Sequence, residues 1–495
     1  MGSSEVPTLI GGRMFTTYYG WRRRHRRVGV VAAAAVLAMS PLVLVASGGA
    51  AATANTSTIV YAVHPIAVQA TSSPSVAGFI PSQCITQFGL ACYDPQILHT
   101  AYQIPWTING QLAGSGEQIA IIDAYGSPTV ASDLATFDAE FGLPSATLHV
   151  YYPSGQPTYN PLQHAGETGW AEETSLDVQT AHALAPGATI NLIVAASPNG
   201  NDLNVAENYA VTNHLGNVMS MSFGAPEAAI AGGGNNLQLQ QANTIFQQAT
   251  IQENMSVFAS SGDSGATNGY TTANALFPAS DPFVTAAGGT DLFVKADTTT
   301  GAKGKPSSSG STNGTYVSEY AWNDANANTC PFGCDYGPFG ATGGAPSSVF
   351  AAPSYQQDVT KSSMRTTSDV SFNASVYTAT MIYLGFLGGA NNGFYFFGGT
   401  SESSPSWAAI TADLAQATGG SLGAMNPILY KLAANPRAYA ADFHDVTVGT
   451  NNFPAGSPGF SAGTGYDLPT GLGTPIVTGL IHSLAPHATY SLTQP

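Results

Sequence analysis

Residues 396–407 contain the serine with the strongest chemical signal in the chain. Two phenylalanines and two glycines precede Thr400 and Ser401, and a run typical of a helix follows Pro405. This order predicts a strand, a tight turn and a helix that begins near the serine. The free N–H groups and the dipole of a helix N-terminus stabilise a developing anion, which is what attack by a serine creates. Because serine is also a preferred helix cap, the segment alone leaves both roles open.

A nucleophilic serine needs a base, and the chain offers a pair of carboxylates. Glu173 and Asp177 lie four residues apart in a helix expected over residues 168–184, so both carboxylates project from one face. Like charges at this spacing repel, and the pair tends to hold one proton. Such a pair can take and return a proton in an acidic medium, where histidine is protonated. The alternative is a pair of solvated acids on a surface helix.

Histidine remains the alternative base. His164 lies in an expected loop and His182 lies late in the same helix. Neither stands in the His-Gly-Thr-His context of the subtilisins, but a neutral, histidine-dependent hydrolase stays open as an interpretation.

A third acid follows the strand expected over residues 256–261. Asp263 is flanked by glycines, which is typical of a turn. A protonated carboxyl in this position can instead donate a hydrogen bond to an oxyanion.

Strand and helix patterns alternate from residue 118 to residue 261. The alternation predicts an α/β fold with a mostly parallel central sheet and helices on both faces. Sites in such sheets form at the carboxyl ends of strands, where Asp123, Gly224, Asp263 and Ser401 are all expected. Residues 295–345 are rich in Gly, Ser, Asn and Thr and are expected to form surface loops.

Three segments of the chain together closely resemble those of the sedolisins, the serine-carboxyl peptidases with a subtilisin-like fold. These segments contain Glu173 and Asp177, Asp263, and Ser401. The resemblance runs from about residue 84 to about residue 487. It implies a serine-type endopeptidase that acts in acid. It further implies that Ser401 is the nucleophile, Glu173 the general base and acid, Asp177 its proton-sharing partner, and Asp263 the oxyanion acid.

The same resemblance implies one structural calcium ion in a C-terminal loop region. Calcium takes about six to eight oxygen ligands from carboxylates and backbone carbonyls. The implied ligands are the carboxylates of Asp445 and Asp467 and the carbonyls of Val446, Gly463 and Gly465. The alternative is an ordinary glycine-rich hairpin.

The chain departs from the family pattern in several places. About thirty residues lie between the expected cleavage site and the expected peptidase domain, where the family usually carries a long prodomain. Phe223 stands where the family usually has a tryptophan, and Glu402 stands beside the nucleophile where a small residue is common. Asp123 is a candidate outer acid of the network. Two alternatives therefore stay open: a weak or inactive homologue that acts as a secreted binding protein, and a tripeptidyl-peptidase.

The N-terminus carries the pattern of a secretory signal. A basic run at residues 22–27 precedes an apolar run at residues 28–45 and then small residues. The alternative is a retained membrane anchor. The expected order is a signal peptide (1–54), a linker or short propeptide remnant (55–83), a peptidase domain (84–487) and a tail (488–495).

The net charge of the chain limits the kinds of molecule that it can bind. Of 13 Lys and Arg, six precede residue 28, and only one of 29 Asp and Glu lies in the signal segment, so the remainder carries about −21. This charge argues against nucleic acid as a partner, and a surface poor in cations suits low pH. We expect a secreted monomer that acts on proteins or peptides, with no stable membrane association after signal cleavage.

Four cysteines accompany the export signal, which permits disulfides. The simplest of three connectivities joins Cys84 to Cys92 and Cys330 to Cys334. A zinc site is the alternative, although close Cys or His partners for it are missing.

Overall fold

A computed structural model describes residues 58–63, 65–76, 79–161, 166–230, 232–295, 314–325 and 337–495. The expected signal segment, His164, Cys330 and Cys334 lie outside these residues. Within the described ranges, no helix combines the length and the apolar character that a membrane span requires.

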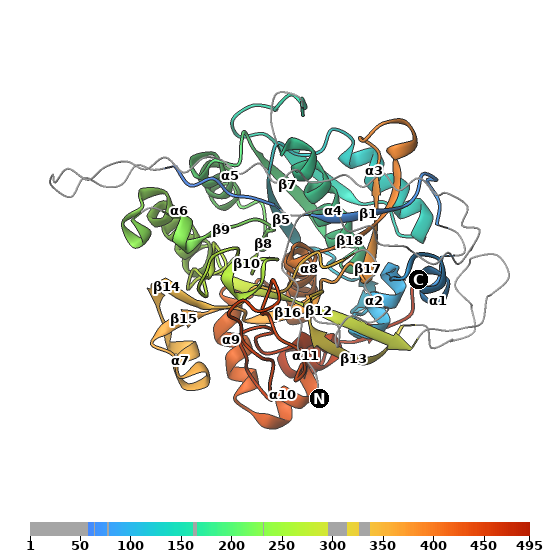
Figure 1. Cartoon of the computed structure of the whole chain (residues 1–495). Helices are drawn as coiled ribbons and strands as arrows, with labels where there is room; N and C mark the ends of the chain where they lie inside the picture. Colours follow the sequence, from blue (N-terminus) through green and yellow to red (C-terminus); the bar gives the residue numbers. More distant parts are fainter. Residues whose placement is uncertain are drawn as a thin grey trace, which may run out of the picture. The chain divides into compact units, whose positions relative to one another are not determined.

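The described residues form an eight-stranded sheet at the centre of the fold (Figure 1). Its strands lie in the order β13-β12-β10-β8-β5-β7-β6, with β16 beside β12. All neighbouring strands are parallel except β12 and β13. The predicted mostly parallel α/β fold is confirmed. The strands are β5 (Gln118–Ala124), β6 (Thr147–Tyr151), β7 (Thr189–Ala195), β8 (Val218–Met221), β10 (Ser256–Ser260), β12 (Thr285–Lys295), β13 (Thr315–Ala321) and β16 (Val370–Asn373).

Alternation along the strands directs side chains to two cores, one on each face of the sheet. Ile119 and Ile121 of β5 belong to the core that holds α4 and α8, whereas Ala120 and Ile122 belong to the core that holds α5 and α6. The predicted helices on both faces are therefore present. The helices are α1 (Pro81–Phe88), α2 (Pro95–Ala101), α3 (Val130–Phe141), α4 (Glu167–Leu184), α5 (Gly200–Thr212), α6 (Leu237–Gln247), α7 (Ser354–Thr360), α8 (Thr400–Thr418), α9 (Met425–Ala433), α10 (Pro436–Asp442) and α11 (Val477–Leu484).

A second sheet holds the strand that leads to the candidate serine. Its order is β1-β18-β17-β2, and β18 (Gly393–Gly398) ends directly before α8. Its other strands are β1 (Ile66–Thr71), β17 (Thr378–Leu384) and β2 (Ala91–Tyr93). Because β1 pairs with β18 along its length, this part of the stretch expected to be a linker or propeptide remnant packs on the folded body.

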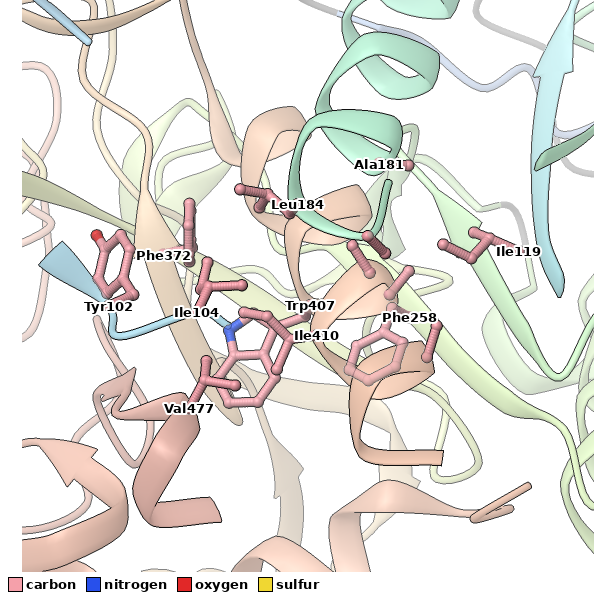
Figure 2. Packing of buried hydrophobic residues seen from close by; sticks show 14 of the residues in the cluster. Tyr102, Ile104, Ile119, Ala181, Leu184, Phe258, Phe372, Trp407, Ile410 and Val477 are labelled. Atoms are coloured by element: carbon pink, nitrogen blue, oxygen red, sulfur yellow. The ribbon is translucent and has the colours of Figure 1, made fainter. Parts of the chain in front are cut away.

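Helix α8 is buried between the sheet and the helices that cover it. It contacts β5, β8, β10, β12, β16, α4 and α11. The Trp407 ring stacks on Phe258 at a centroid distance of 6.5 Å, and its Nε1 donates to the Ser371 carbonyl at 2.8 Å. Figure 2 shows Trp407 and Ile410 among the apolar side chains of this core. A helix buried this deeply holds its first turn, and the serine on it, in one position.

The expectation that residues 295–345 form only surface loops is wrong in part. Strand β13 lies within them and pairs antiparallel with β12 at the edge of the central sheet. Its buried positions, such as Glu319 and Ala321, face the core, which a count of Gly, Ser, Asn and Thr does not reveal. Residues 296–313 and 326–336 lie outside the described residues.

The disulfide predicted between Cys84 and Cys92 is confirmed. Its sulfur atoms are 2.05 Å apart, and it joins α1 to β2. The bridge ties the segment that precedes the central sheet to the second sheet.

The burial of the Glu319 carboxyl predicts that the fold is more stable in acid. Its carboxyl accepts hydrogen bonds from the Tyr102 hydroxyl and the Thr290 hydroxyl, both at 2.7 Å, and from the Thr474 hydroxyl. Burial nevertheless raises its pKa to about 7. A raised carboxyl pKa in the folded state gives stability that is complete below the unfolded value and is lost as pH rises toward about 7.

We expect the ionisation of Glu319 to lower the free energy of unfolding by about 3 kcal/mol between pH 4.5 and pH 8. Glu319→Gln should reduce the difference between the two pH values by about that amount in chemical denaturation. Asp358→Asn, which changes an exposed acid on α7, is the control. An unchanged difference in Glu319→Gln would contradict the assignment.

Candidate active site

The turn between β18 and α8 brings Ser401 to the start of a buried helix. Gly399 adopts φ 122°, a conformation that strains any residue with a side chain, and a Cβ there would lie 2.9 Å from Asp263 Oδ2. Ser401 is 3% exposed, and its Oγ donates to the carbonyl of Ser222 at 3.4 Å. The strand, turn and helix predicted around the serine are confirmed.

Pro405 leaves the Ser401 carbonyl without its usual helical hydrogen bond, so that a neighbouring serine can bond to it. Pro405 lies four residues after Ser401 and has no N–H to donate to the Ser401 carbonyl. The Ser222 hydroxyl lies 3.2 Å from this carbonyl and 2.8 Å from Asp177 Oδ1. Ser222 therefore connects Asp177 on α4 to the backbone of the candidate nucleophile.

Three carboxyls without a neighbouring cation gather beneath this serine. Glu173, Asp177 and Asp123 are all fully buried, so the interpretation of solvated acids is wrong. Burial raises the pKa of Glu173 well above its ordinary value, the nearby Ser401 hydroxyl opposes the rise, and Asp123 and Asp263 add to it. Burial likewise raises the pKa of Asp177, to which Asp123 and Glu173 contribute. Coupled carboxyls of this kind share protons rather than all ionising.

Both oxygens of Glu173 and of Asp123 lack a hydrogen bond to any described residue. The carboxyl of Glu173 is thus available to the serine hydroxyl once the latter turns away from the Ser222 carbonyl. Apo geometry of this looser kind is common in catalytic pairs, which tighten when substrate binds.

Asp263 lies on the other side of the serine, in the loop after β10. Its Oδ1 accepts hydrogen bonds from the Thr400 N–H and the Thr400 hydroxyl, both at 2.7 Å. The Thr400 hydroxyl in turn accepts from the Gly262 N–H at 3.1 Å. These bonds hold the carboxyl of Asp263 directly before the helix N-terminus that carries Ser401.

His182, the alternative base that lies within the described residues, contacts Pro144 and Asp138 instead of Ser401. Its Nε2 is 2.8 Å from the Pro144 carbonyl and 3.3 Å from Asp138 Oδ1, and its side chain is fully buried. These contacts hold the imidazole against Pro144 and Asp138. The ring therefore does not serve Ser401 as a base. The structure thus brings together all four residues that the sequence singles out for catalysis, with carboxyls in the place of a histidine.

Two curated relatives and one solved structure match most of the chain. Kumamolisin from Bacillus sp. strain MN-32 is 32% identical over 411 residues, which cover 80% of this chain and 64% of the relative. Sedolisin from Pseudomonas sp. strain 101 is 32% identical over 370 residues, covering 72% of this chain and 56% of the relative. A solved structure of Pseudomonas sedolisin, a serine-carboxyl proteinase in complex with pseudo-iodotyrostatin, superposes with a TM-score of 0.65 at 26% identity and covers 80% and 99% of the two chains.

The chain belongs to the sedolisin family. It spans about 64% and 56% of the lengths of the two curated relatives. No protein-family model matches the chain.

The departures from the sedolisin pattern have a structural account. Phe223 is buried, and its ring lies 5.8 Å from Trp170, which precedes Glu173 on α4 by less than one turn. Phe223 therefore makes an aromatic contact with the helix that carries Glu173 and Asp177. Glu402 is fully buried rather than directed outward, and its oxygens accept from Asn373 Nδ2 at 3.3 and 3.5 Å.

Ser222 is the residue of this sedolisin site whose part the sequence analysis missed. The signal that could have found it is the combination of a serine at the end of a predicted strand and a proline four residues after the nucleophile. The two become related only when β8 and α8 lie side by side.

The two carboxylates that are expected to bind calcium, those of Asp445 and Asp467, lie close to one another. Asp445 accepts from the Gly465 N–H at 3.1 Å, and Asp467 accepts from the Gly463 N–H at 2.9 Å and the Thr470 N–H at 2.8 Å. Burial raises the pKa of Asp467 to about 6, and Asp445 adds to the rise. The described residues contain no group of three or more His, Cys, Asp or Glu that could hold a metal. A cation here would depend on two carboxylates and on backbone carbonyls, which is a donor set that suits calcium.

We predict that replacing Glu402 changes the stability of the fold rather than catalysis. Burial raises its pKa well above the ordinary value, so the protonated form, which Gln imitates, is the one the site favours. We expect Glu402→Gln to keep kcat/KM within about threefold and the unfolding temperature at pH 7 equal or higher. Peptide hydrolysis and thermal melts measure both. A loss of about 100-fold in kcat/KM with the fold intact would instead assign Glu402 to the chemistry.

Proposed function

We propose that the chain is a serine-carboxyl endopeptidase that hydrolyses peptide bonds in acid. The observation that supports this proposal best is the burial of Glu173, Asp177 and Asp123 beside the hydroxyl of Ser401, with Asp263 bound to the same turn. Buried acids of this kind titrate above their ordinary range and can act as base and acid in turn.

In this mechanism, the Ser401 oxygen attacks the carbonyl carbon of the scissile bond and its proton passes to Glu173. Asp177 shares a proton with Glu173. The negative charge that leaves the Glu173 carboxylate appears on the oxyanion, to which Asp263, protonated in acid, donates a hydrogen bond. Glu173 then gives the proton to the leaving amine, which leaves an acyl-enzyme on Ser401. A water molecule attacks the acyl group, again with Glu173 as base, and the carboxylic acid product departs.

Acid pH follows from the protonation states that this sequence requires. Glu173 must be able to accept a proton while Asp263 still holds one. The coupled buried acids cannot all ionise, so a partly protonated cluster is its stable state. We therefore expect activity to fall as pH rises and Asp263 loses its proton.

Replacing the four residues one at a time tests the mechanism. We expect Ser401→Ala to abolish hydrolysis of a protein substrate in acid, and Glu173→Gln or Asp263→Asn to lower kcat by about 100-fold or more. Asp358→Asn, which changes an exposed acid on α7, is the control. Equal activity of the Ser401→Ala variant across the acid range would refute the proposal.

Two alternatives differ from this proposal in the products they predict. A tripeptidyl-peptidase releases three-residue products only from substrates with a free N-terminus, so blocking the N-terminus of a peptide stops it. An inactive homologue that acts as a binding protein would leave proteins intact at every acid pH. Mass spectrometry of peptide products separates the three.

We also propose that the protein is secreted and that one calcium ion binds the C-terminal loop. Asp445 and Asp467 would supply carboxylates, and Val446, Gly463 and Gly465 would supply carbonyls. The ion would neutralise two neighbouring acids, of which Asp445 raises the pKa of Asp467. Its part is structural, since the loop lies outside the catalytic group.

Thermal melts test the calcium proposal. We expect a chelator to lower the unfolding temperature by several degrees and millimolar calcium to restore it, because a ligand that binds only the folded state stabilises it. Asp467→Asn should lower the unfolding temperature and remove the response to calcium. Melts of the parent chain that are identical with and without calcium would contradict the proposal.

A further inference from the structure

Residues 339–343, here called the support segment, lie against the loop that carries Asp263. The Ala341 N–H donates to the Asp263 carbonyl at 3.0 Å, and the Gly265 N–H donates to the Ala341 carbonyl at 3.0 Å. These bonds pair the two stretches of backbone as neighbouring strands are paired. The backbone of Asp263 therefore takes its position from the support segment.

The contact between the support segment and Asp263 is too close for a side chain. A Cβ on Gly340 would lie 2.7 Å from the Asp263 carbonyl oxygen and 2.8 Å from the Trp322 ring. Because a Cβ does not approach other atoms this closely, the position requires glycine. In packing this dense, a shift of the support segment moves the Asp263 backbone with it.

Asp324 fixes one end of the support segment. Its Oδ2 accepts hydrogen bonds from the Phe339 N–H and the Gly340 N–H, both at 3.2 Å, and its Oδ1 accepts from Trp322 Nε1 at 2.9 Å. Its own N–H donates to the Gly340 carbonyl at 3.0 Å. Asp324 is 6% exposed, so these bonds lie away from water, where the loss of an acceptor is costly.

Asp291 is a second buried acid next to Asp324. Its neighbour Thr290 on β12 pairs with Ala321, so Asp291 lies beside the residues that lead from β13 to Asp324. Burial raises the pKa of Asp291 well above its ordinary value, and Asp324 adds to the rise. Burial also raises the pKa of Asp324, to about 7, and the three hydrogen bonds that it accepts oppose the rise. Two neighbouring buried acids share protons, and Asp324, which holds the three donors, is the acceptor of this pair.

The loop after β16 connects Asp324 to the turn before Ser401. The Ser375 hydroxyl lies 3.5 Å from Asp324 Oδ1. The carbonyl of its neighbour Ala374 accepts from the Gly399 N–H at 2.6 Å. Asp324 thus contacts both of the segments that hold the groups of the proposed reaction.

We propose that Asp324, supported by Asp291, is a positioning residue for the oxyanion acid: it holds the support segment where the carboxyl of Asp263 meets the developing charge. This inference rests on the proposed peptidase function. An oxyanion donor acts only when it lies about 3 Å from the position that the oxyanion takes. A displacement of about 1 Å that originates far from the chemistry can lower a rate about 100-fold. Because a displaced oxyanion acid weakens the transition state and not the bound substrate, the loss falls on kcat rather than on KM.

A double-mutant cycle in the full chain tests whether Asp324 acts through Asp263. We expect Asp324→Asn to lower kcat by about 10-fold or more with KM within about twofold, because an amide nitrogen cannot accept the bonds of the support segment. Once Asp263→Asn has removed the acid, the second change should matter little, so the double variant should lie within about threefold of Asp263→Asn. Losses that multiply in the double variant would overturn the inference.

A control and a second pair of variants keep the test independent of folding. Glu319→Gln is the matched control, because Glu319 is equally buried but accepts its hydrogen bonds from residues outside the support segment. It should leave kcat in acid within about twofold. Asp291→Asn keeps a donor beside Asp324 and should keep kcat within about threefold, whereas Asp291→Leu removes the donor and should lower kcat about 10-fold. Equal kcat in these two variants, with thermal melts that show both folded, would refute the part of Asp291.

A binding measurement separates this inference from the proposed function. The probes are the peptide aldehyde acetyl-Leu-Leu-leucinal and the alcohol of the same sequence. The Ser401 oxygen adds to the aldehyde carbon, its proton passes to Glu173, and the aldehyde oxygen becomes an oxyanion, whereas the alcohol forms no such adduct. We expect Asp324→Asn to weaken binding of the aldehyde about 10-fold and to leave binding of the alcohol unchanged.

The outcomes of this measurement are distinct. Aldehyde binding that Asp324→Asn weakens selectively, in a parent chain that hydrolyses no protein in acid, keeps the positioning role and refutes the peptidase. Hydrolysis by the parent chain, with aldehyde binding that Asp324→Asn leaves unchanged or weakens equally with that of the alcohol, keeps the peptidase and refutes the positioning role.

Discussion

The burial of helix α8 is the constraint on which the rest of the structure depends. This helix runs through the core against five strands of the central sheet, and its Trp407 and Ile410 fill the space between the sheet and the outer helices. A buried helix cannot shift along its axis without breaking close packing over its whole length. Its first turn is therefore a rigid platform, and Ser401 takes its position from side chains up to two turns away.

The second consequence of this burial is electrostatic. Ser401, Glu173 and Asp177 lie where two buried helices meet, and water that would solvate the carboxyls is excluded. After residue 54 the chain has only seven Lys and Arg, and one of them, Arg365, is fully buried in an ion pair with Asp369. Acids elsewhere in the core, such as Glu319 and Glu402, have no salt bridge within the described ranges, and burial raises their pKa values so that the protonated form is favoured. The same shortage of cations thus favours protonated acids in both the site and the core.

Residues 59–62 cover the loops that follow β7 and β8. Gly224 and the segment at Pro198–Gly200 present backbone groups, and residues 59–62 pair with both of them. Unpaired backbone groups at such a place are costly unless water or another segment pairs with them. This pairing therefore fixes residues 59–62 beside the loop that carries Ser222.

Sequence alone predicted the alternating elements and the fold class, favoured the Cys84–Cys92 bridge as the simplest pairing, and singled out Ser401, Glu173, Asp177 and Asp263 as candidates for catalysis. These depend on local order: a period of 3.6 or 2, a glycine pair before a helix, two acids one turn apart. Tertiary structure alone decided that Glu402 turns inward, that β13 completes the sheet, and that Ser222 joins Asp177 to the nucleophile. It also decided that the ring of Tyr61 packs against Phe223, the residue after Ser222. Each of these is a contact between residues far apart in the chain, and such contacts arise from the packing of whole elements, which no local pattern encodes.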